Sequence, residues 1–153
     1  MLTSLPALRR LGALVLLLAA ASFIAGCHGT AYPTSTTWPL GGTVWKLVQL
    51  NGASVAANHL PSLTFDTVNH QVSGFAGVNT LSGSYTQQET ALSFGPLAVT
   101  RKAGDPKKMQ LEANFLQTLG RVTSWKIDGA ILSFFVGETE VARFQGMPAG
   151  SRE

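Results

Sequence analysis

The chain has 153 residues; 45% of them are hydrophobic, 12% are charged, and 11 Lys and Arg stand against 8 Asp and Glu. This length is enough for one domain with a core of its own. Arg9 and Arg10 lie in a segment that we expect to be removed, which leaves nine basic residues against eight acidic ones. That near balance excludes a protein that binds nucleic acid through a strongly basic surface.

The N-terminal segment has the pattern of a bacterial lipoprotein signal peptide. Arg9 and Arg10 precede an apolar run, Leu11–Phe23, which is followed by Ile24-Ala25-Gly26-Cys27. The run is shorter than the about 20 residues of a membrane-spanning helix. We expect residues 1–26 to be the signal peptide and Cys27 to be the lipidated first residue of the mature chain. The alternatives are a non-lipidated signal peptide cut nearby and a buried structural cysteine.

Lipidation of Cys27 would hold the protein on a membrane. Several acyl chains of the palmitate type on one cysteine anchor a protein essentially permanently. Because Cys27 is the single cysteine of the chain, its acylation leaves no thiol for a disulfide or a cysteine metal site. His28 stands where many lipoproteins retained at the inner membrane have an aspartate. By that analogy we expect the outer membrane, with the protein facing the periplasm.

Residues 27–42 are expected to form the lipidated cysteine and a flexible tether. His28–Gly42 is rich in Thr, Ser, Pro and Gly and contains no Asp, Glu, Lys or Arg. Fully extended, it would lift the domain at most about 50 Å from the bilayer. Trp38 would either pack on the domain or sit at the membrane interface, and the nearby Leu40 favours packing.

Alternating apolar residues and turn residues predict a succession of strands between residues 43 and 146. Asn51-Gly52 and Asp128-Gly129 are expected as turns, and residues 147–153 as a disordered tail. The expected strands are Thr43–Leu50, Ser62–Thr67, Gln71–Phe75, Ser82–Thr86, Ala91–Val99, Val122–Ile127, Ile131–Val136 and Glu140–Phe144.

One helix is predicted between the fifth and sixth of these strands. Asp105 is a good N-cap, Pro106 suits the first helical position, and Gly120 is a stop signal. The residues expected to form its core face are Leu111, Phe115, Leu116 and Leu119. Many short strands with one late helix predict an α+β class: a small antiparallel β-rich domain, a curled sheet or partial barrel with one α-helix.

Several segments together resemble the META domain family, of the heat-shock HslJ type. The matching segments are Gly42-Thr43-Val44-Trp45-Lys46-Leu47, Leu50-Asn51-Gly52, Pro61-Ser62-Leu63-Thr64-Phe65, Ser73-Gly74-Phe75-Ala76-Gly77-Val78-Asn79, Ser82-Gly83-Ser84-Tyr85, Leu97-Ala98-Val99-Thr100-Arg101 and 112–119. The resemblance implies a β-rich envelope or secreted domain over residues 43–146, with no established enzymatic activity or cofactor. Members are linked to heat and antibiotic stress and to virulence, and a similarity to pilot lipoproteins of secretion systems has been proposed.

This sequence departs from the family at two positions. Members commonly have a cysteine before the Asn of the Gly-Asn segment and another shortly after Thr-Arg, where this chain has Val78 and Gly104. The absence of both cysteines from this chain is consistent with contact between the two cysteines in the family fold. The resemblance therefore implies no redox role for this chain.

Asn79 is a candidate contact residue in a glycine-rich segment. It is expected either to lock its turn by hydrogen-bonding its own backbone or, less favoured, to contact a ligand. Gly74, Gly77 and Gly83 resemble a phosphate cradle, but no helix follows them, so they are expected to permit bulges and close strand approach.

The residue types of a hydrolase triad occur at Asp66, His70 and Ser73, without the strained nucleophile turn that such a triad requires. We therefore expect a polar turn there and no catalytic residue. His28 and His59 do not form a ligand cluster with His70, so no metal site is expected.

Four of the nine mature basic residues, Arg101, Lys102, Lys107 and Lys108, gather around the start of the predicted helix. The helix dipole already favours anions there, so these residues form a possible binding surface for lipid headgroups or an acidic partner. The simpler interpretation is a solvated loop with Asp105 capping the helix.

Trp45, Phe65, Tyr85 and Trp125 are expected on strands, where they either fill the core or line an apolar cavity. The sequence thus predicts a membrane-anchored, non-catalytic binding domain in envelope maintenance or stress tolerance, a monomer with no cofactor and an unknown envelope protein or lipid as partner. The alternative is a pilot-like carrier of lipid or an amphipathic secretin segment in an apolar groove.

Overall fold

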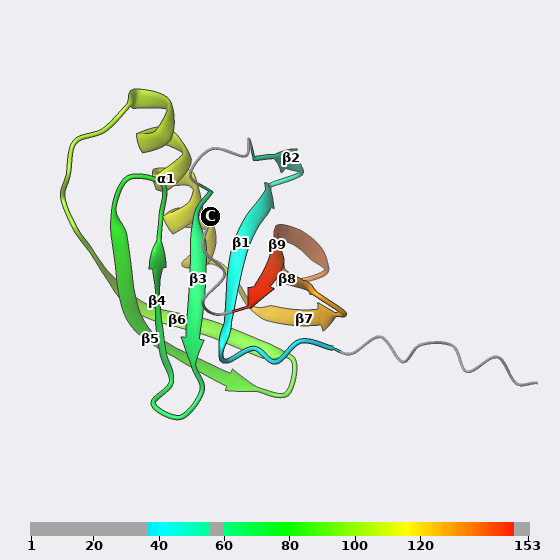
Figure 1. Cartoon of the computed structure of the whole chain (residues 1–153). Coiled ribbons are helices and arrows are strands. Elements are labelled where there is room, and N and C mark those ends of the chain that lie inside the picture. Colours follow the sequence, from blue (N-terminus) through cyan, green and yellow to red (C-terminus); the bar gives the residue numbers. More distant parts are fainter. Residues whose placement is uncertain (1–36, 56–59, 149–153) are drawn as a thin grey trace, which may run out of the picture. The chain divides into compact units, whose positions relative to one another are not determined.

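The structure is a computed structural model that describes residues 37–55 and 60–148, which form nine strands and one helix (Figure 1). The chain divides into two units, Met1–Tyr32 and Pro33–Glu153, and every described residue lies in the second. Cys27, His28 and His59 lie outside the described residues, as do the predicted signal peptide, residues 27–36 of the predicted tether and residues 149–153 of the predicted tail.

All nine strands belong to one antiparallel sheet with the order β2-β1-β3-β4-β5-β6-β7-β8-β9. In chain order the elements are β1 Thr43–Leu50, β2 Ala53–Ser54, β3 Ser62–Asp66, β4 Gln71–Phe75, β5 Thr80–Gln88, β6 Ala91–Val99, α1 Pro106–Leu119, β7 Ser124–Asp128, β8 Ile131–Val136 and β9 Thr139–Pro148. The predicted α+β class, a curled antiparallel sheet with one helix, is confirmed.

The sheet curls because β1 pairs on one side with β3 and on the other with β9. The β1–β9 register runs from Thr43 opposite Pro148 to Leu50 opposite Ala142. β9 therefore extends two residues past the predicted domain end at residue 146. The pairing of β6 with β7 is much shorter, with Ala91 opposite Ser124.

The helix begins and ends where its capping residues predict. The Asp105 carboxylate accepts hydrogen bonds from the backbone N–H of Lys107 and Lys108, and Gly120 follows the last helical residue. The predicted core face is confirmed, since Phe115 and Leu119 are buried and Leu111 and Leu116 are partly buried and pack against the core. The buried face also includes Glu112 and Thr118, which were not predicted.

Aromatic side chains fill the interior of the curled sheet. Trp45, Phe65 and Tyr85 are 0%, 2% and 2% exposed, and the Phe65 and Tyr85 rings meet edge to face with centroids 5.1 Å apart. Phe134 continues this packing against Phe65 and Phe144. These residues therefore build the core. Trp125 is only partly buried at its edge.

The segment before β1 packs on the domain from Trp38 onward. The Trp38 backbone N–H donates to the Gly129 carbonyl at 2.9 Å. Leu40 is buried, and its carbonyl accepts the indole N–H of Trp45 at 3.0 Å. The predicted packing of Trp38 is confirmed, and the domain begins before the predicted boundary at residue 43.

Glycine is needed at Gly74 because two strands approach closely there. A Cβ at this position would lie 1.9 Å from the Ser62 carbonyl oxygen of the paired strand β3. The glycines of this region thus permit close strand approach, as the sequence predicts, and the short β4–β5 loop that follows contains Asn79.

Candidate functional site

Asn79 joins the β4–β5 loop to the segment that leads from β6 to α1. Its side-chain oxygen accepts hydrogen bonds from the Lys102 backbone N–H at 2.7 Å and the Thr100 hydroxyl at 2.9 Å. Its side-chain nitrogen donates to the Lys102 carbonyl at 3.2 Å and to Glu112 at 2.8 Å. Asn79 is 2% exposed. Its amide therefore fixes the backbone of Lys102, which is a positioning role.

Glu112 reaches from α1 to the same loop. One carboxylate oxygen accepts the backbone N–H groups of Val78 at 3.0 Å and Asn79 at 2.7 Å, and the other accepts the Asn79 side chain. Burial by itself would raise the pKa of Glu112, but these hydrogen bonds from Asn79 and Val78 outweigh it and hold the pKa below its usual value. Glu112 is thus ionised, and it holds the β4–β5 loop against α1.

The loop approaches the linker and the helix closely at two glycines. A Cβ at Gly104 would lie 3.3 Å from the Val78 Cβ. Gly77 has a φ of +132°, and a Cβ there would lie 3.4 Å from the Lys108 carbonyl oxygen of α1. The positions at which the family commonly has cysteines are therefore in direct contact in this fold, as the family resemblance implies.

A surface groove of about 490 Å³, which we call the basic groove, opens over this network. Its lining residues are Asn79, Leu97, Val99, Thr100, Arg101, Lys102, Ala103, Met109 and Glu112. Leu97 and Val99 are partly buried and pack against the core, whereas Arg101 and Lys102 are exposed. The groove thus combines an apolar floor with a cationic rim, an arrangement that suits an amphipathic ligand with an anionic group.

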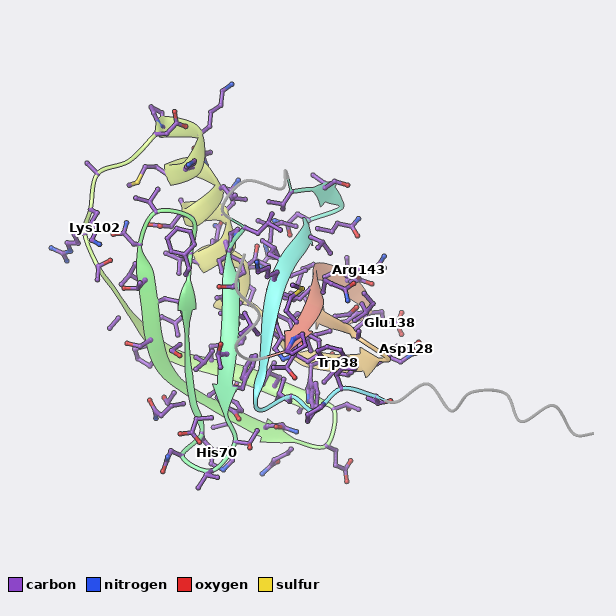
Figure 2. All side chains as sticks on the ribbon, in the orientation of Figure 1. Trp38, His70, Lys102, Asp128, Glu138 and Arg143 are labelled. Carbon is purple, nitrogen blue, oxygen red and sulfur yellow. The ribbon has the colours of Figure 1, made fainter. Side chains whose placement is uncertain are left out.

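The four predicted basic residues do not all belong to this groove. Arg101 and Lys102 line it, but Lys107 and Lys108 lie on the first turn of α1 and are not among its lining residues. All four are exposed, and within residues 37–55 and 60–148 none forms an ion pair. Figure 2 shows Lys102 on the linker, at the opposite side of the domain from Trp38.

The predicted polar turn at Asp66 is confirmed. The Asp66 carboxylate accepts the backbone N–H groups of Val68 and Asn69 and the Asn69 side-chain amide. The side-chain and backbone hydrogen bonds from Asn69 lower the pKa of Asp66. The His70 ring lies against Tyr85, with centroids 5.7 Å apart. These contacts give the Asp66–His70 segment a structural explanation.

The described residues contain neither a metal-binding cluster nor a membrane-spanning helix. No group of three or more His, Cys, Asp or Glu side chains in that part of the chain is placed to hold a metal ion. No helix within it is long and apolar enough to cross a bilayer.

A second groove, of about 470 Å³, lies beside Trp38, and we call it the tryptophan groove. Its lining comes from three parts of the chain, namely the segment before β1, the β5–β6 turn and β7. The lining residues are Thr37, Trp38, Pro39, Leu40, Glu89, Thr90, Trp125, Lys126 and Ile127. Trp125 thus belongs to a surface groove as well as to the edge of the core.

Sequence reasoning missed Glu112 and the tryptophan groove. Glu112 lies three residues before Phe115 and seven before Leu119, so helical spacing alone places it on the buried face. A carboxylate on an apolar face is a signal that it has a specific partner. Nothing in the sequence signals the tryptophan groove, because Trp38 and Trp125 meet only in the folded chain.

Comparisons with known proteins agree with this architecture. The family model described as the META domain matches residues 38–147. A protein from Burkholderia xenovorans, solved by NMR, is similar at 26% identity and a TM-score of 0.57, over 71% of this chain and 83% of that one. No curated protein matches the chain.

Two further solved structures share the fold. One is an NMR structure at 19% identity and a TM-score of 0.55, over 69% of this chain and 91% of that one. The other is the crystal structure of a DUF4847 family protein from Bacteroides vulgatus at 12% identity and a TM-score of 0.52, over 74% of this chain and 96% of that one. The family match covers all of the described residues except Thr37 and Pro148, and it includes the Asn79 and Glu112 network. The chain therefore belongs to the META domain family.

Proposed function

We propose that this protein is a lipoprotein of the bacterial cell envelope, anchored through Cys27, whose META domain acts by binding an envelope partner and carries out no chemistry. The outer membrane is the proposed location, and envelope maintenance or stress tolerance is the proposed role. The sequence Ile24-Ala25-Gly26-Cys27 after a basic and apolar start supports the anchor. The basic groove supports the binding role.

The single observation that carries the binding role is the way in which the groove is held. Asn79 fixes both the N–H and the carbonyl of Lys102, and Glu112 fixes the loop that contains Asn79. A rim whose backbone is already ordered loses less conformational entropy when a ligand binds. This preorganisation favours a ligand-binding role for the segment over the simpler interpretation of a solvated loop.

The groove also indicates the chemistry of its partner. Arg101 presents a guanidinium that can bind a carboxylate with two hydrogen bonds, and Lys102 adds a second charge. Leu97, Val99 and Met109 offer apolar area between these charges. We propose an acidic, partly apolar segment of an envelope protein as the ligand, and an anionic lipid headgroup is the competing outcome of the test.

The alternative function, a pilot-like carrier of lipid or an amphipathic secretin segment in an apolar groove, receives less support from the interior of the sheet. Trp45, Phe65 and Tyr85 would line such a cavity, but they pack against one another and their neighbours at 0% to 2% exposure. A filled core favours recognition at the surface over transport inside the sheet.

Photocrosslinking in living cells tests the proposal. A photoreactive residue at Lys102 is expected to give one abundant protein adduct, whereas the same probe at Glu138, on the other side of the domain in Figure 2, gives none. In the same cells, Cys27→Ala should move the protein from the membrane fraction to the soluble periplasm. A Cys27→Ala protein that stays in the membrane would contradict the anchor, and lipid adducts alone at Lys102 would contradict a protein partner.

Two double charge-reversal variants separate the effect of the basic groove from the effect of net charge. Arg101→Glu/Lys102→Glu and Lys107→Glu/Lys108→Glu change the net charge equally, but only the first pair lines the groove. We expect the first double variant to lose the adduct at a probe placed on Met109 by tenfold or more, and the second to keep most of it, because closely placed charge pairs are worth about 1.5 kcal/mol or more at an interface. Equal losses in both variants would show that the groove has no specific role.

A further inference from the structure

The tryptophan groove is not used by the proposed partner binding. Four of its nine lining residues have large apolar side chains, namely Trp38, Leu40, Trp125 and Ile127, whereas the basic groove has Arg101 and Lys102 at its rim. All four are at least partly buried and pack into or against the core. The groove is therefore a fixed feature of the fold and not a chance gap between mobile side chains.

Hydrogen bonds hold the backbone of Trp38 and both the backbone and the indole ring of Trp125 in place. The Trp38 backbone N–H donates to the Gly129 carbonyl at 2.9 Å. The Trp125 backbone N–H donates to Thr90 at 2.9 Å, and its indole N–H donates to the Glu89 carbonyl at 3.0 Å. Since the polar atom of the Trp125 ring already has a partner, the ring can present apolar area without leaving an unsatisfied donor.

We infer that the tryptophan groove is the membrane-contact face of the domain and rests on the lipid bilayer interface. This inference depends on the proposed lipid anchor at Cys27. Thr37, which lines the groove, stands ten positions after Cys27 in the sequence. That length of chain reaches at most about 36 Å when fully extended and about 17 Å as a flexible coil. The groove is thus the part of the domain that the anchor brings nearest to the lipid.

The side chains of the groove have the chemistry of a bilayer interface. Tryptophan is enriched at the level of the lipid headgroups, where its ring has apolar and polar neighbours, and a lysine beside it can extend its ammonium toward water and phosphate. Lys126 lies 3.9 Å from Asp128, and Glu89 is nearby, so acidic charges offset its charge. The contact therefore depends on apolar area and is insensitive to the charge of the lipid.

This orientation leaves the basic groove free. Figure 2 shows Trp38 and Lys102 on opposite sides of the domain, and Figure 1 shows α1 at the end away from the segment that leads to β1. With Trp38 against the bilayer, the Arg101 and Lys102 rim faces the periplasm. One end of the domain then contacts lipid and the other contacts the partner.

Fluorescence quenching by lipid tests the inference. The full-length lipidated protein is reconstituted into phosphatidylcholine vesicles with or without bromine atoms on the acyl chains, and emission is compared. Trp45 is 0% exposed and serves as an internal reference. We expect brominated lipid to quench the wild-type protein, to quench Trp38→Phe and Trp125→Phe less, and to leave the double variant Trp38→Phe/Trp125→Phe unquenched. In that double variant, a new tryptophan introduced by Lys102→Trp should also remain unquenched.

The outcomes distinguish a failure of the proposed lipid anchor from a failure of the proposed orientation of the domain on the membrane. If the wild-type protein does not float with the vesicles, the anchor proposed at Cys27 fails. If it floats and its emission is the same with and without bromine, the anchor stands and the membrane-contact face is overturned. Quenching that appears only with anionic lipid, or that Lys102→Trp shows equally, also overturns it. Protection of Trp38 and Trp125 from water-soluble acrylamide without any lipid quenching would assign the groove to a second copy of the chain or to residues 28–36, and would overturn the inference as well.

Discussion

Glu112 stabilises the site as a buried carboxylate that meets neutral N–H donors. Its oxygens accept hydrogen bonds from the backbone of Val78 and Asn79 and from the Asn79 side chain. In the described part of the chain no Lys, Arg or His side chain pairs with it. A carboxylate in this position is well matched, because each donor points at an acceptor and none is left unsatisfied.

Replacing the carboxylate by an amide should destabilise the domain. In Glu112→Gln one oxygen becomes an NH₂ group that faces N–H donors, and we expect a loss of about 1–3 kcal/mol in the free energy of unfolding at pH 7. Urea unfolding followed by fluorescence measures this loss. The control is Glu138→Gln, since Glu138 is exposed in the β8–β9 turn, where substitutions change stability by less than about 0.5 kcal/mol.

The stability difference between wild type and Glu112→Gln depends on pH, and the direction of this dependence follows from the pKa of Glu112. The folded pKa of Glu112 lies below its model-peptide value of 4.5, so the unfolded state binds a proton first as the pH falls. The carboxylate therefore stabilises the fold fully above about pH 4.5 and loses this contribution as the pH falls through the lower folded pKa. The stability difference between wild type and Glu112→Gln should shrink below pH 4.5. A difference that stays constant down to pH 3 would contradict the assignment.

At the scale of elements, the β4–β5 loop is held between the linker after β6 and the first turns of α1. Val78 fills the space above Gly104, where a Cβ would lie 3.3 Å away. Disulfide-bonded Cβ atoms lie about 3.5–4.5 Å apart, so a small adjustment of the backbone is sufficient for a bond. In this chain apolar packing and the Asn79 hydrogen bonds connect the same two segments.

The variant Val78→Cys/Gly104→Cys should therefore form a disulfide under oxidising conditions. In a Cys27→Ala background no third thiol interferes, and non-reducing electrophoresis together with mass spectrometry detects the bond. We expect the oxidised form to be more stable to urea than its reduced form by about 3 kcal/mol, from the closed loop in the unfolded chain. The single variants Val78→Cys and Gly104→Cys are the controls. Two free thiols after prolonged oxidation would show that the segments are not in contact in solution.

The sequence predicted best the elements whose limits depend on local chemistry. The limits of β1, β4, β6 and β8 agree with the structure, and β1 and β8 end where Asn51-Gly52 and Gly137 follow the alternating run. The same holds for α1, whose ends are determined by Asp105-Pro106 and Gly120. The strand β5 begins two residues before and ends two residues after the predicted Ser82–Thr86, because Leu81 pairs with Val99 of β6 and the polar residues Gln87 and Gln88 pair with Leu92 and Ala91.

The site could be predicted only in part, because it depends on contacts between distant segments. The basic residues near α1 were accessible from sequence, but the Asn79 side chain does not bond its own turn as predicted, and its bonds to Lys102 and Glu112 span 23 and 33 positions. Sequence also does not show that two of the four basic residues line the groove and two lie outside it, because this division depends on the fold. The extension of β9 to Pro148 has the same cause, since those residues pair with β1.

At the scale of the whole molecule, the curled sheet has one weak seam. The strands β1 and β9 pair along almost their full length, but β6 and β7 share one short pairing at Ala91 and Ser124. The Leu92 N–H donates to Thr123 at 3.1 Å, and the Trp125 N–H donates to Thr90 at 2.9 Å. A groove of about 510 Å³ lies on one side of this seam and the tryptophan groove lies on the other.

The seam should open more readily than the rest of the sheet, because a short run of hydrogen bonds between two solvent-filled grooves costs little to break. Leu92 and Leu47 form a matched pair, since both side chains are buried at 1% and 0% exposure, while the Leu47 N–H donates to Pro61 in the well-paired part of the sheet. We expect the Leu92 and Trp125 amides to exchange hydrogen at least tenfold faster than the Leu47 amide in native-state exchange followed by NMR, a difference of about 1.4 kcal/mol. Low concentrations of urea should accelerate exchange at Leu47, which requires global unfolding, and leave Leu92 nearly unchanged. Equal exchange rates and equal urea dependence at both leucines would mean that the sheet opens as one unit, and that the grooves beside β7 are as rigid as the core behind them.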